Sequence, residues 1–164
     1  MKRIGLLSDT HSFLDEAVLR HFEACDEIWH AGDIGSLKVT DALEKEKPLR
    51  AVFGNIDGAD IRRVFKENLR FEIEGLKVWM THIGGYPGNY SPLVRKEIYA
   101  DPPGLFICGH SHILKVMMDK KLNCLHMNPG AMGNHGFHVV KTMLRFSIEN
   151  GRVLDLDVFE KKRT

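Results

Sequence analysis

Seven side chains that favour divalent metal ions follow short apolar runs in the first 112 residues of the sequence. They are two carboxylates, one amide and four imidazoles: Asp9, His11, Asp33, Asn55, His82, His110 and His112. Carboxylate oxygens and neutral imidazole nitrogens together suit divalent transition metals. A single carboxylate can also bridge two cations that would otherwise repel each other. Such a pair of ions, about 3.5–4 Å apart, lowers the pKa of bound water and attracts a phosphate anion.

The elements that must position these side chains are the strands of a parallel sheet. Apolar runs predict strands at 3–8, 27–31 and 49–54, and helical spacing predicts helices at 13–24, with Ser12 as N-cap, and at about 36–46. This alternation is typical of right-handed crossovers between parallel strands. Because the carboxyl ends of parallel strands share one edge, we expect the polar side chains that follow the strands to meet there.

The second half of the chain has an antiparallel character. The patterns predict a hairpin of 69–74 and 76–81, a helix from Ser91-Pro92 to about Tyr99, and strands at 104–108, 113–119, 121–127, 138–148 and 152–159. The turn at Asn150-Gly151 is a strong hairpin signal. A parallel start with an antiparallel finish predicts an α/β fold in which helices flank two mixed sheets.

The composition favours one globular domain that spans residues 1–164. This length suits a single domain, at roughly 150 residues per domain. Lys and Arg total 23 against 22 Asp and Glu, which leaves a formal net charge of +1. Because no basic stripe stands out, neither nucleic acid nor an anionic membrane surface is expected as the main partner. No apolar run approaches the roughly 20 residues that span a bilayer.

The cysteines and the N-terminus favour a soluble cytoplasmic protein. Cys25, Cys108 and Cys124 are odd in number and widely spaced, which argues against a disulfide framework or a C-x-x-C zinc site. The chain reaches Asp9 too soon to hold the apolar region of a signal peptide.

Taken singly, each candidate ligand also has an ordinary structural interpretation. An Asp after a strand often caps a helix, and an Asn beside a glycine often belongs to a turn. A lone His is more often a hydrogen-bonded core or surface residue than a ligand. The joint appearance of all seven, each at the end of a predicted strand, favours a metal centre.

The same residues lie in segments that resemble a known family. Five segments are similar to the motifs of the calcineurin-like metallophosphoesterases: Ser8-Asp9-Thr10-His11, Gly32-Asp33-Ile34-Gly35, Gly54-Asn55-Ile56-Asp57, Thr81-His82 and Gly109-His110-Ser111-His112. Asn128-Pro129-Gly130 resembles a segment of the short YfcE-like phosphodiesterase branch. The resemblance spans residues 4–130 and implies a four-layer α/β-β/α sandwich.

The resemblance also implies a two-metal site and its chemistry. One ion would be held by Asp9, His11, Asp33 and His112, and the other by Asp33, Asn55, His82 and His110. Asp33 would then bridge the ions, and a hydroxide between them would attack the phosphorus of a small phosphate ester, with Asn55 and His82 positioning phosphate and nucleophile. Mn is the expected metal, and the donor set is also compatible with Fe, Ni, Co or Zn.

Two positions depart from the family pattern. Many members carry a His directly after the motif Asn, where it acts near the leaving group, whereas this chain carries Ile56. Since Ile cannot donate a proton, we expect diesters with good leaving groups to be favoured over simple monoesters. The stretch around His135 also differs from the branch: His135 either binds phosphate or replaces the missing acid, or it is a surface residue. Asp57 either supports the ligands by hydrogen bonds or caps the helix that follows.

Several alternatives to a phosphodiesterase stay open at this point. The same superfamily contains a retromer subunit that resembles this chain in size and acts as a non-catalytic protein-binding scaffold, although it departs from the metal-binding pattern. Phosphomonoesterases and nucleases also belong to the superfamily. The expected partner is a small phosphate ester, and a homo-oligomer is a further possibility because apolar sheet edges often pair.

Overall fold

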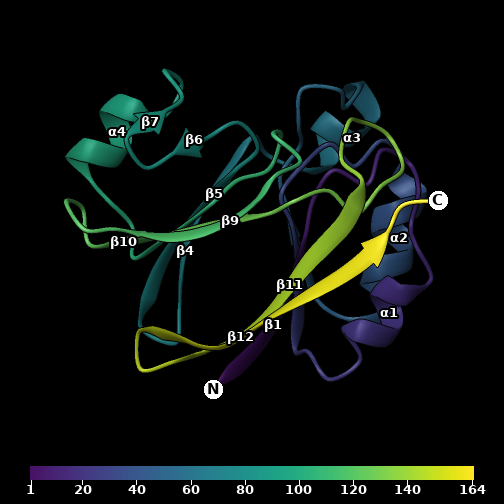
Figure 1. Ribbon diagram of the computed structural model, residues 1–164, viewed down its shortest axis with the longest axis horizontal. Coiled ribbons are helices and arrows are strands. Elements are labelled where there is room, and N and C mark those ends of the chain that lie inside the picture. The colour runs from purple at the N-terminus through teal and green to yellow at the C-terminus, as the bar shows by residue number, and fades with distance from the viewer.

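The computed structural model describes residues 1–164 and contains two five-stranded sheets packed face to face (Figure 1). The strands of the first sheet are β1 (Lys2–Leu7), β2 (Glu27–His30), β3 (Leu49–Ala51), β11 (Val140–Glu149) and β12 (Arg152–Lys162). Their order is β12-β11-β1-β2-β3. The strands of the second sheet are β4 (Asn68–Ile73), β5 (Leu76–Thr81), β8 (Leu105–Ile107), β9 (Leu114–Asp119) and β10 (Cys124–Pro129). Their order is β4-β5-β8-β10-β9.

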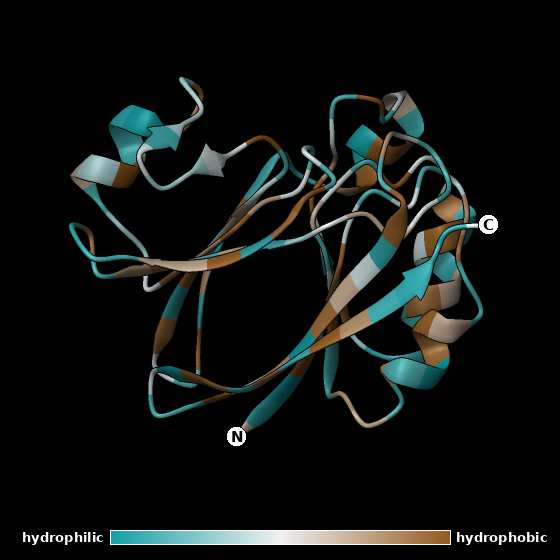
Figure 2. Ribbon diagram, viewed as in Figure 1, coloured by the Kyte–Doolittle hydropathy of each residue, from teal (hydrophilic) through white to brown (hydrophobic).

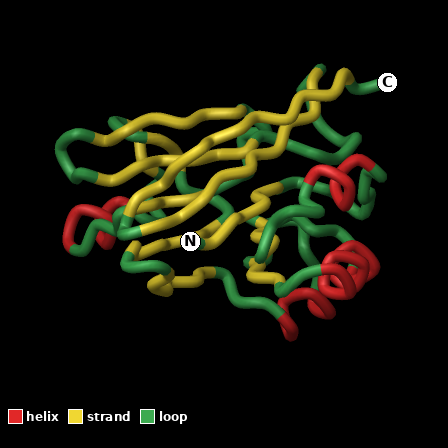
Figure 3. The backbone as a smooth tube through the Cα atoms, turned by 90° about the horizontal axis from the view of Figure 1, so that it is seen from below, coloured by secondary structure: helices red, strands yellow, loops and turns green.

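Helices cover the outer faces of both sheets. They are α1 (Ala17–His21), α2 (Leu37–Glu46), α3 (Ala59–Val64) and α4 (Arg95–Ala100). The first three lie on the outer side of the first sheet, whereas α4 lies on the outer side of the second, beside a small hairpin of β6 (Gly85–Tyr86) and β7 (Asn89–Tyr90) (Figures 1 and 3). The result is a four-layer α/β-β/α sandwich, as predicted. No helix combines the length and the apolar character needed to cross a membrane.

Three apolar clusters hold these layers together. The largest lies between the sheets and includes Leu6, Trp29 and Ile107, each fully buried. A second cluster joins the first sheet to its helices, and a third joins the second sheet to α4. Hydrophobic segments accordingly recur along the strands of both sheets and on the helices beside them (Figure 2). Burial of apolar area on this scale is the main force that presses the two sheets together.

The pairing of the strands matches the expected change of character only in part, because β8 pairs with both β5 and β10 in parallel register. β1 pairs with β2, and β2 with β3, in parallel register. The predicted hairpin forms between β4 and β5, and β11 and β12 form another that turns at Asn150-Gly151. The carboxyl ends of β1, β2 and β3 therefore share one edge of the first sheet.

Some predicted boundaries are wrong for local reasons. The first helix starts at Ala17 rather than near Ser12, because Ser12 has a left-handed backbone (φ 70°) and the Asp15 carboxylate accepts the Ala17 N–H. The third strand ends at Ala51 instead of 54, and the strand expected at 121–127 is shifted to β10 because Asp119 closes a turn onto Lys121. The helix α4 starts at Arg95, after a turn. The β6–β7 hairpin was not predicted.

Candidate metal centre

Both sheets contribute side chains to one edge of the sandwich. Asp9 and His11 follow β1, Asp33 follows β2 and Asn55 follows β3, while the second sheet contributes the imidazoles that follow β5 and β8. The side chains form two groups whose donor atoms lie within 4.8 Å of one another: Asp9, His11 and His112, and Asp33, His82 and His110. The structure thus brings together six of the seven predicted donors in two adjacent groups.

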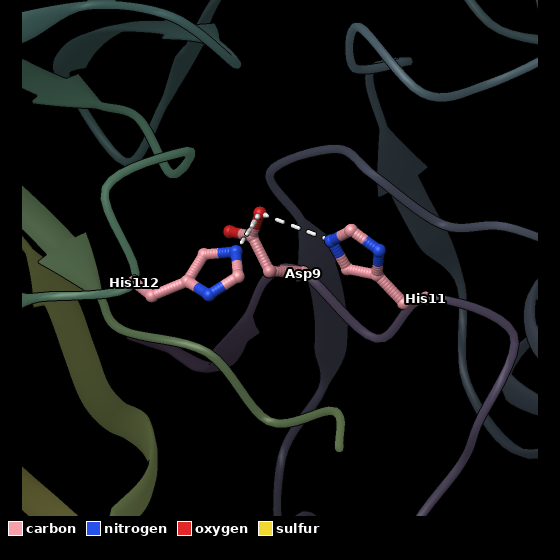
Figure 4. A group of neighbouring side chains, drawn as sticks. All are labelled: Asp9, His11 and His112. Atoms are coloured by element: carbon pink, nitrogen blue, oxygen red, sulfur yellow. Dashed lines mark ion pairs between the residues drawn. The ribbon is translucent and has the colours of Figure 1, made fainter. Parts of the chain in front are cut away.

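The first group is centred on the Asp9 carboxylate. Asp9 Oδ1 lies 3.2 Å from His112 Nε2 and 3.9 Å from His11 Nε2. Figure 4 shows the two imidazoles reaching this carboxylate from opposite sides. The other oxygen, Oδ2, accepts hydrogen bonds from the Ser8 hydroxyl (2.7 Å) and the His110 backbone N–H (3.1 Å). One oxygen of Asp9 is therefore held by the protein, and the other faces the imidazoles.

The second group connects to the first through Asp33. Asp33 Oδ2 lies 3.2 Å from His82 Nε2 and 3.4 Å from His11 Nε2, so it stands between the two groups. Its other oxygen accepts the Ile56 backbone N–H at 3.1 Å. Asn55, the seventh predicted donor, lies beside the second group, with Oδ1 3.0 Å from His110 Nδ1. Asp33 therefore lies between the two groups, at the position that a bridging carboxylate must occupy.

Buried polar atoms without partners indicate that the residues present fit divalent cations. Asp9 Oδ1, His11 Nε2 and His82 Nε2 are buried and have no hydrogen-bond partner. Leaving such atoms unpaired costs about 1–3 kcal/mol each, and more for a charged group. All three face the space between the two groups. The donor set of carboxylate oxygens and imidazole nitrogens is the one that divalent transition metals use.

The backbone around these donors is held in unusual conformations. Asp9, His11, Asp33, His110 and His112 all have positive φ angles, between 45° and 72°. A non-glycine residue in this region is uncommon and costs of order 1 kcal/mol or more. Strained residues persist only where the surrounding fold holds them in place, and they cluster at functional sites. Their concentration at the donors is therefore typical of such a site.

The two carboxylates are ionised in this environment. Burial opposes the charge of Asp9, but the facing imidazoles of His11 and His112 outweigh it and bring the pKa of Asp9 well below the usual range. Burial likewise opposes ionisation of Asp33, yet the facing imidazole of His82, 3.2 Å away, lowers the pKa of that carboxyl. The Asp9 carboxylate raises the pKa of His11. Burial opposes the charged form of His82, but the carboxylates of Asp33 and, to a smaller extent, Asp9 outweigh it and raise the pKa of His82. Strong negative charge at the donors is what attracts cations.

Backbone and side-chain groups orient the imidazoles. His82 Nδ1 donates to the Ala31 carbonyl at 2.7 Å, which leaves the lone pair of Nε2 facing Asp33. Behind Asp9, the buried His30 accepts the Gly32 N–H at Nδ1 (3.1 Å) and donates from Nε2 to Thr10 Oγ1 (2.9 Å). Burial lowers the pKa of His30 to about 4, so this ring is neutral. Its two hydrogen bonds connect the loops after β1 and β2.

Asp57 lies behind the donors and is buried. Its carboxylate accepts the backbone N–H groups of Ile34 (3.1 Å), Gly35 (2.8 Å) and Gly54 (2.8 Å). The N-cap position of α3 is instead occupied by Gly58, with no side-chain cap. Of the two roles open from the sequence, the geometry favours support of the loops that carry Asp33 and Asn55. Asp57 is buried, and a direct role in catalysis stays a prediction.

Two supporting residues were missed as site residues in the sequence. The Asn128 amide donates to the Gly109 carbonyl (2.9 Å) and to Ser111 Oγ (3.0 Å), and thereby fixes the loop that carries His110 and His112. Ser8 donates to Asp9 as described above. Their signal was available, because both belong to segments that carried the resemblance, but nothing in the sequence gave the direction of their side chains.

His135 lies against the first group and is exposed. Its ring stacks on His11 with centroids 4.8 Å apart, and it lines a hollow together with Ile56 and Phe137. His138 instead binds the Gly133 carbonyl through Nε2 at 2.8 Å. The loop after Gly130 therefore lies beside the metal-binding edge of the sandwich. This position is needed if His135 binds phosphate or replaces the missing acid. The chemical role of His135 stays a prediction.

Comparison with known proteins places the chain among phosphoesterases. Residues 1–151 match the model of the calcineurin-like phosphoesterase superfamily domain. A probable metallophosphoesterase of Methanothermobacter thermautotrophicus is 33% identical over 141 residues, which cover 78% of this chain and 76% of that protein. A probable metallophosphoesterase of Methanocaldococcus jannaschii is 33% identical over 137 residues, covering 78% and 67%.

Solved structures share the fold at lower identity. A novel archaeal phosphodiesterase superposes with a TM-score of 0.76 at 23% identity, over 96% of this chain and 99% of that one. Vps29 of Entamoeba histolytica, in complex with Zn, superposes with a TM-score of 0.76 at 13% identity, over 99% of both chains. The same architecture therefore occurs in a phosphodiesterase and in a vacuolar sorting protein.

Proposed function

Because the chain belongs to the calcineurin-like phosphoesterase superfamily, we propose that it is a phosphodiesterase that works with two divalent metal ions. The observation that carries this proposal is the position of Asp33, whose Oδ2 lies within 3.4 Å of an imidazole from each donor group. The proposed ligands of the ions are Asp9, His11, Asp33 and His112 on one side, and Asp33, Asn55, His82 and His110 on the other. Mn is the first choice of metal, with Fe, Ni, Co or Zn as alternatives.

When bound, the two ions would supply Lewis-acid activation of a phosphate oxygen and of a water nucleophile. The chain's own residues prepare the site for this chemistry. Asp9 and Asp33 hold negative charge in a largely buried position, and the Ala31 carbonyl fixes the His82 ring with Nε2 facing inward. Asp57 and Asn128 hold the loops, so that little reorganisation accompanies binding.

The side chain after Asn55 supports a diester rather than a monoester. Ile56 is 47% exposed and lines the hollow in front of the donors, where it can neither donate nor accept a proton. A diester with an acidic alcohol as leaving group needs little proton transfer at the departing oxygen. An alkyl monoester depends much more on a general acid. The preferred substrate is therefore a small diester with a good leaving group.

A direct test compares bis-(p-nitrophenyl) phosphate with p-nitrophenyl phosphate, which share a leaving group. Metal-stripped protein is assayed before and after addition of Mn. We expect turnover that requires metal and a kcat/KM that is higher for the diester. A higher value for the monoester would contradict the diesterase assignment. Metal binding without turnover of either ester would indicate a narrow substrate range, whereas absence of both metal binding and turnover would favour the alternative, a non-catalytic scaffold with the fold shared by Vps29.

A further inference from the structure

A cavity of about 680 Å³ lies between the β6–β7 hairpin and the outer face of the second sheet. Its wall includes His110 and Ser111 from the loop of the metal centre, and it continues along the sheet to Lys115 and His126. The cavity is thus adjacent to the place where a phosphate would be held. Nothing in the chemistry proposed above uses it.

The charge on the cavity wall is entirely positive. Lys115 and Arg95 line it, and no Asp or Glu is among its lining residues. Neither cation forms an ion pair with a carboxylate: Lys115 Nζ lies 4.3 Å above the ring of Tyr86, and Arg95 donates to the Tyr90 carbonyl at 2.9 Å. Two cations without a counter-charge in a concave site favour an anionic ligand.

An aromatic surface accompanies this charge. Tyr86 is 42% exposed and belongs to the β6–β7 hairpin, while Lys115 belongs to β9 on the sheet. The contact between them therefore spans the two sides of the cavity. An exposed tyrosine ring in a concave site is well suited to stack on another ring.

The floor of the cavity contains a buried imidazole that has no partner. His126 is 1% exposed, and both of its ring nitrogens lack a hydrogen-bond partner. Burial lowers its pKa to about 4, so the ring is neutral and carries one donor and one acceptor. Buried polar atoms are normally paired, and an unpaired imidazole that lines a cavity points to a ligand that supplies polar atoms.

We propose that this cavity is a specificity subsite for the non-leaving arm of the substrate, and that it selects an arm with an aromatic ring and a negative charge. The ring would stack on Tyr86, and the charge would pair with Lys115 and Arg95. Because the cavity lies beside His110, an arm bound in it would keep the ester phosphorus at the metal centre. This inference rests on the proposed function, because it names the class of diester that the same centre hydrolyses.

A matched pair of substrates isolates the charge of the arm. p-Nitrophenyl 4-carboxyphenyl phosphate and p-nitrophenyl phenyl phosphate share the leaving group and differ by one carboxylate on the other arm. For the Mn-loaded protein we expect a kcat/KM about tenfold higher for the carboxylated diester, the worth of one partly screened charge-assisted contact. A ratio of one or below would overturn the proposal.

The variant Lys115→Ala tests which residue sets this ratio. We expect it to bring the ratio of the two kcat/KM values close to one. Lys120→Ala is the matched control, since Lys120 is an exposed lysine in the turn directly after β9, outside the cavity. It should leave both rates and their ratio unchanged. A preference that survives Lys115→Ala, or that is lost equally in the control, would contradict the assignment.

A binding measurement separates this subsite from the catalytic proposal. Metal-free protein is titrated with 4-hydroxybenzoate, the free alcohol of the charged arm, and with phenol, while the histidine ring signals are followed by ¹H–¹⁵N NMR. We expect the His126 signals to shift with 4-hydroxybenzoate, with an affinity about tenfold weaker in Lys115→Ala. Absence of a shift would overturn the subsite even if diesters are hydrolysed. A shift in a protein that hydrolyses no ester would refute the function and leave the anion site standing.

Discussion

The two sheets contribute different chemistry to the same centre. The first sheet supplies both carboxylates, at the ends of β1 and β2, whereas the second supplies three of the four imidazoles, from the residues after β5 and β8. Each donor group combines the two sources, since His112 joins Asp9 and His11, while His82 and His110 join Asp33. Neither sheet alone holds a complete group, so the centre can form only once the apolar cluster between the sheets has packed.

The supports behind the donors differ in the same way. On the first sheet, the negatively charged Asp57 gathers three backbone N–H groups, and on the second the neutral amide of Asn128 binds a carbonyl and a hydroxyl. Negative charge is therefore concentrated on one side of the centre and neutral donors on the other. We expect changes on the carboxylate side to cost more than changes on the imidazole side.

The largest effect is expected from Asp33→Asn. This change removes the charge placed between the two groups while it preserves the size of the side chain, so turnover should fall by more than about 1,000-fold and one metal ion should be lost. Diester hydrolysis and metal content by elemental analysis measure both effects. Asp41→Asn, on the exposed face of α2, is the matched control and should behave as wild type. Full activity in Asp33→Asn would exclude the bridging role.

A smaller loss is expected from Asp57→Asn. The amide can accept N–H groups through only one atom, so the loops that carry Asp33 and Asn55 should loosen, with a loss of about 10- to 100-fold in metal affinity. Isothermal titration with Mn gives the affinity, and circular dichroism verifies that the fold is kept. We expect saturating Mn to restore most of the turnover. A loss of turnover that persists at saturating metal would instead place Asp57 in the chemistry.

Metal affinity should also depend on pH through the imidazoles that face the carboxylates. In the metal-free protein the pKa values of His11 and His82 are raised above the ordinary 6.5. Protons therefore compete with metal for these imidazoles at any pH below the raised pKa values. Affinity should fall as the pH drops from 8 to 6, by up to about tenfold per unit for each competing proton. Titration calorimetry in buffers of different ionisation enthalpy measures the protons released. Binding that releases none between pH 6 and 7 would contradict this electrostatic picture.

The smallest effect is expected from His126→Phe, on the face of the second sheet that turns away from the carboxylates. Burial lowers the pKa of His126 to about 4, below the ordinary 6.5. Between pH 6.5 and 4 the unfolded chain therefore binds more protons than the folded protein, and the wild-type protein loses stability as the pH falls through this interval. Chemical denaturation of the metal-free proteins at pH 7.5 and 5 should show a loss about 2 kcal/mol smaller in the variant. Equal losses would mean that His126 is charged in the folded protein.

The sequence predicted the fold and the convergence of the donors because both follow from local patterns. Apolar runs followed by Asp9, Asp33 and Asn55 identified parallel strands and their shared edge. The start of α1 could not be predicted, since the Asp15 carboxylate that accepts the Ala17 N–H is also bound by Lys141, which is distant in the sequence. For the same reason the direction of Asp57 stayed open between two alternatives.

The cavity beside the centre shows the limit of sequence patterns more clearly. Lys115 and His126 line the same cavity only because β9 and β10 pair, and Tyr86 contacts Lys115 only because the short β6–β7 hairpin folds back over the sheet. No periodicity in the sequence marks these contacts. Properties that depend on distant segments therefore require the structure.

Electron paramagnetic resonance of the Mn-loaded protein would reveal whether two metal ions share the centre through Asp33. We expect two Mn ions per chain and an exchange-coupled spectrum, because ions about 3.5–4 Å apart and bridged by one carboxylate would interact magnetically. In Asp33→Asn the coupling should disappear. A single uncoupled Mn per wild-type chain at saturation would exclude a centre shared through Asp33.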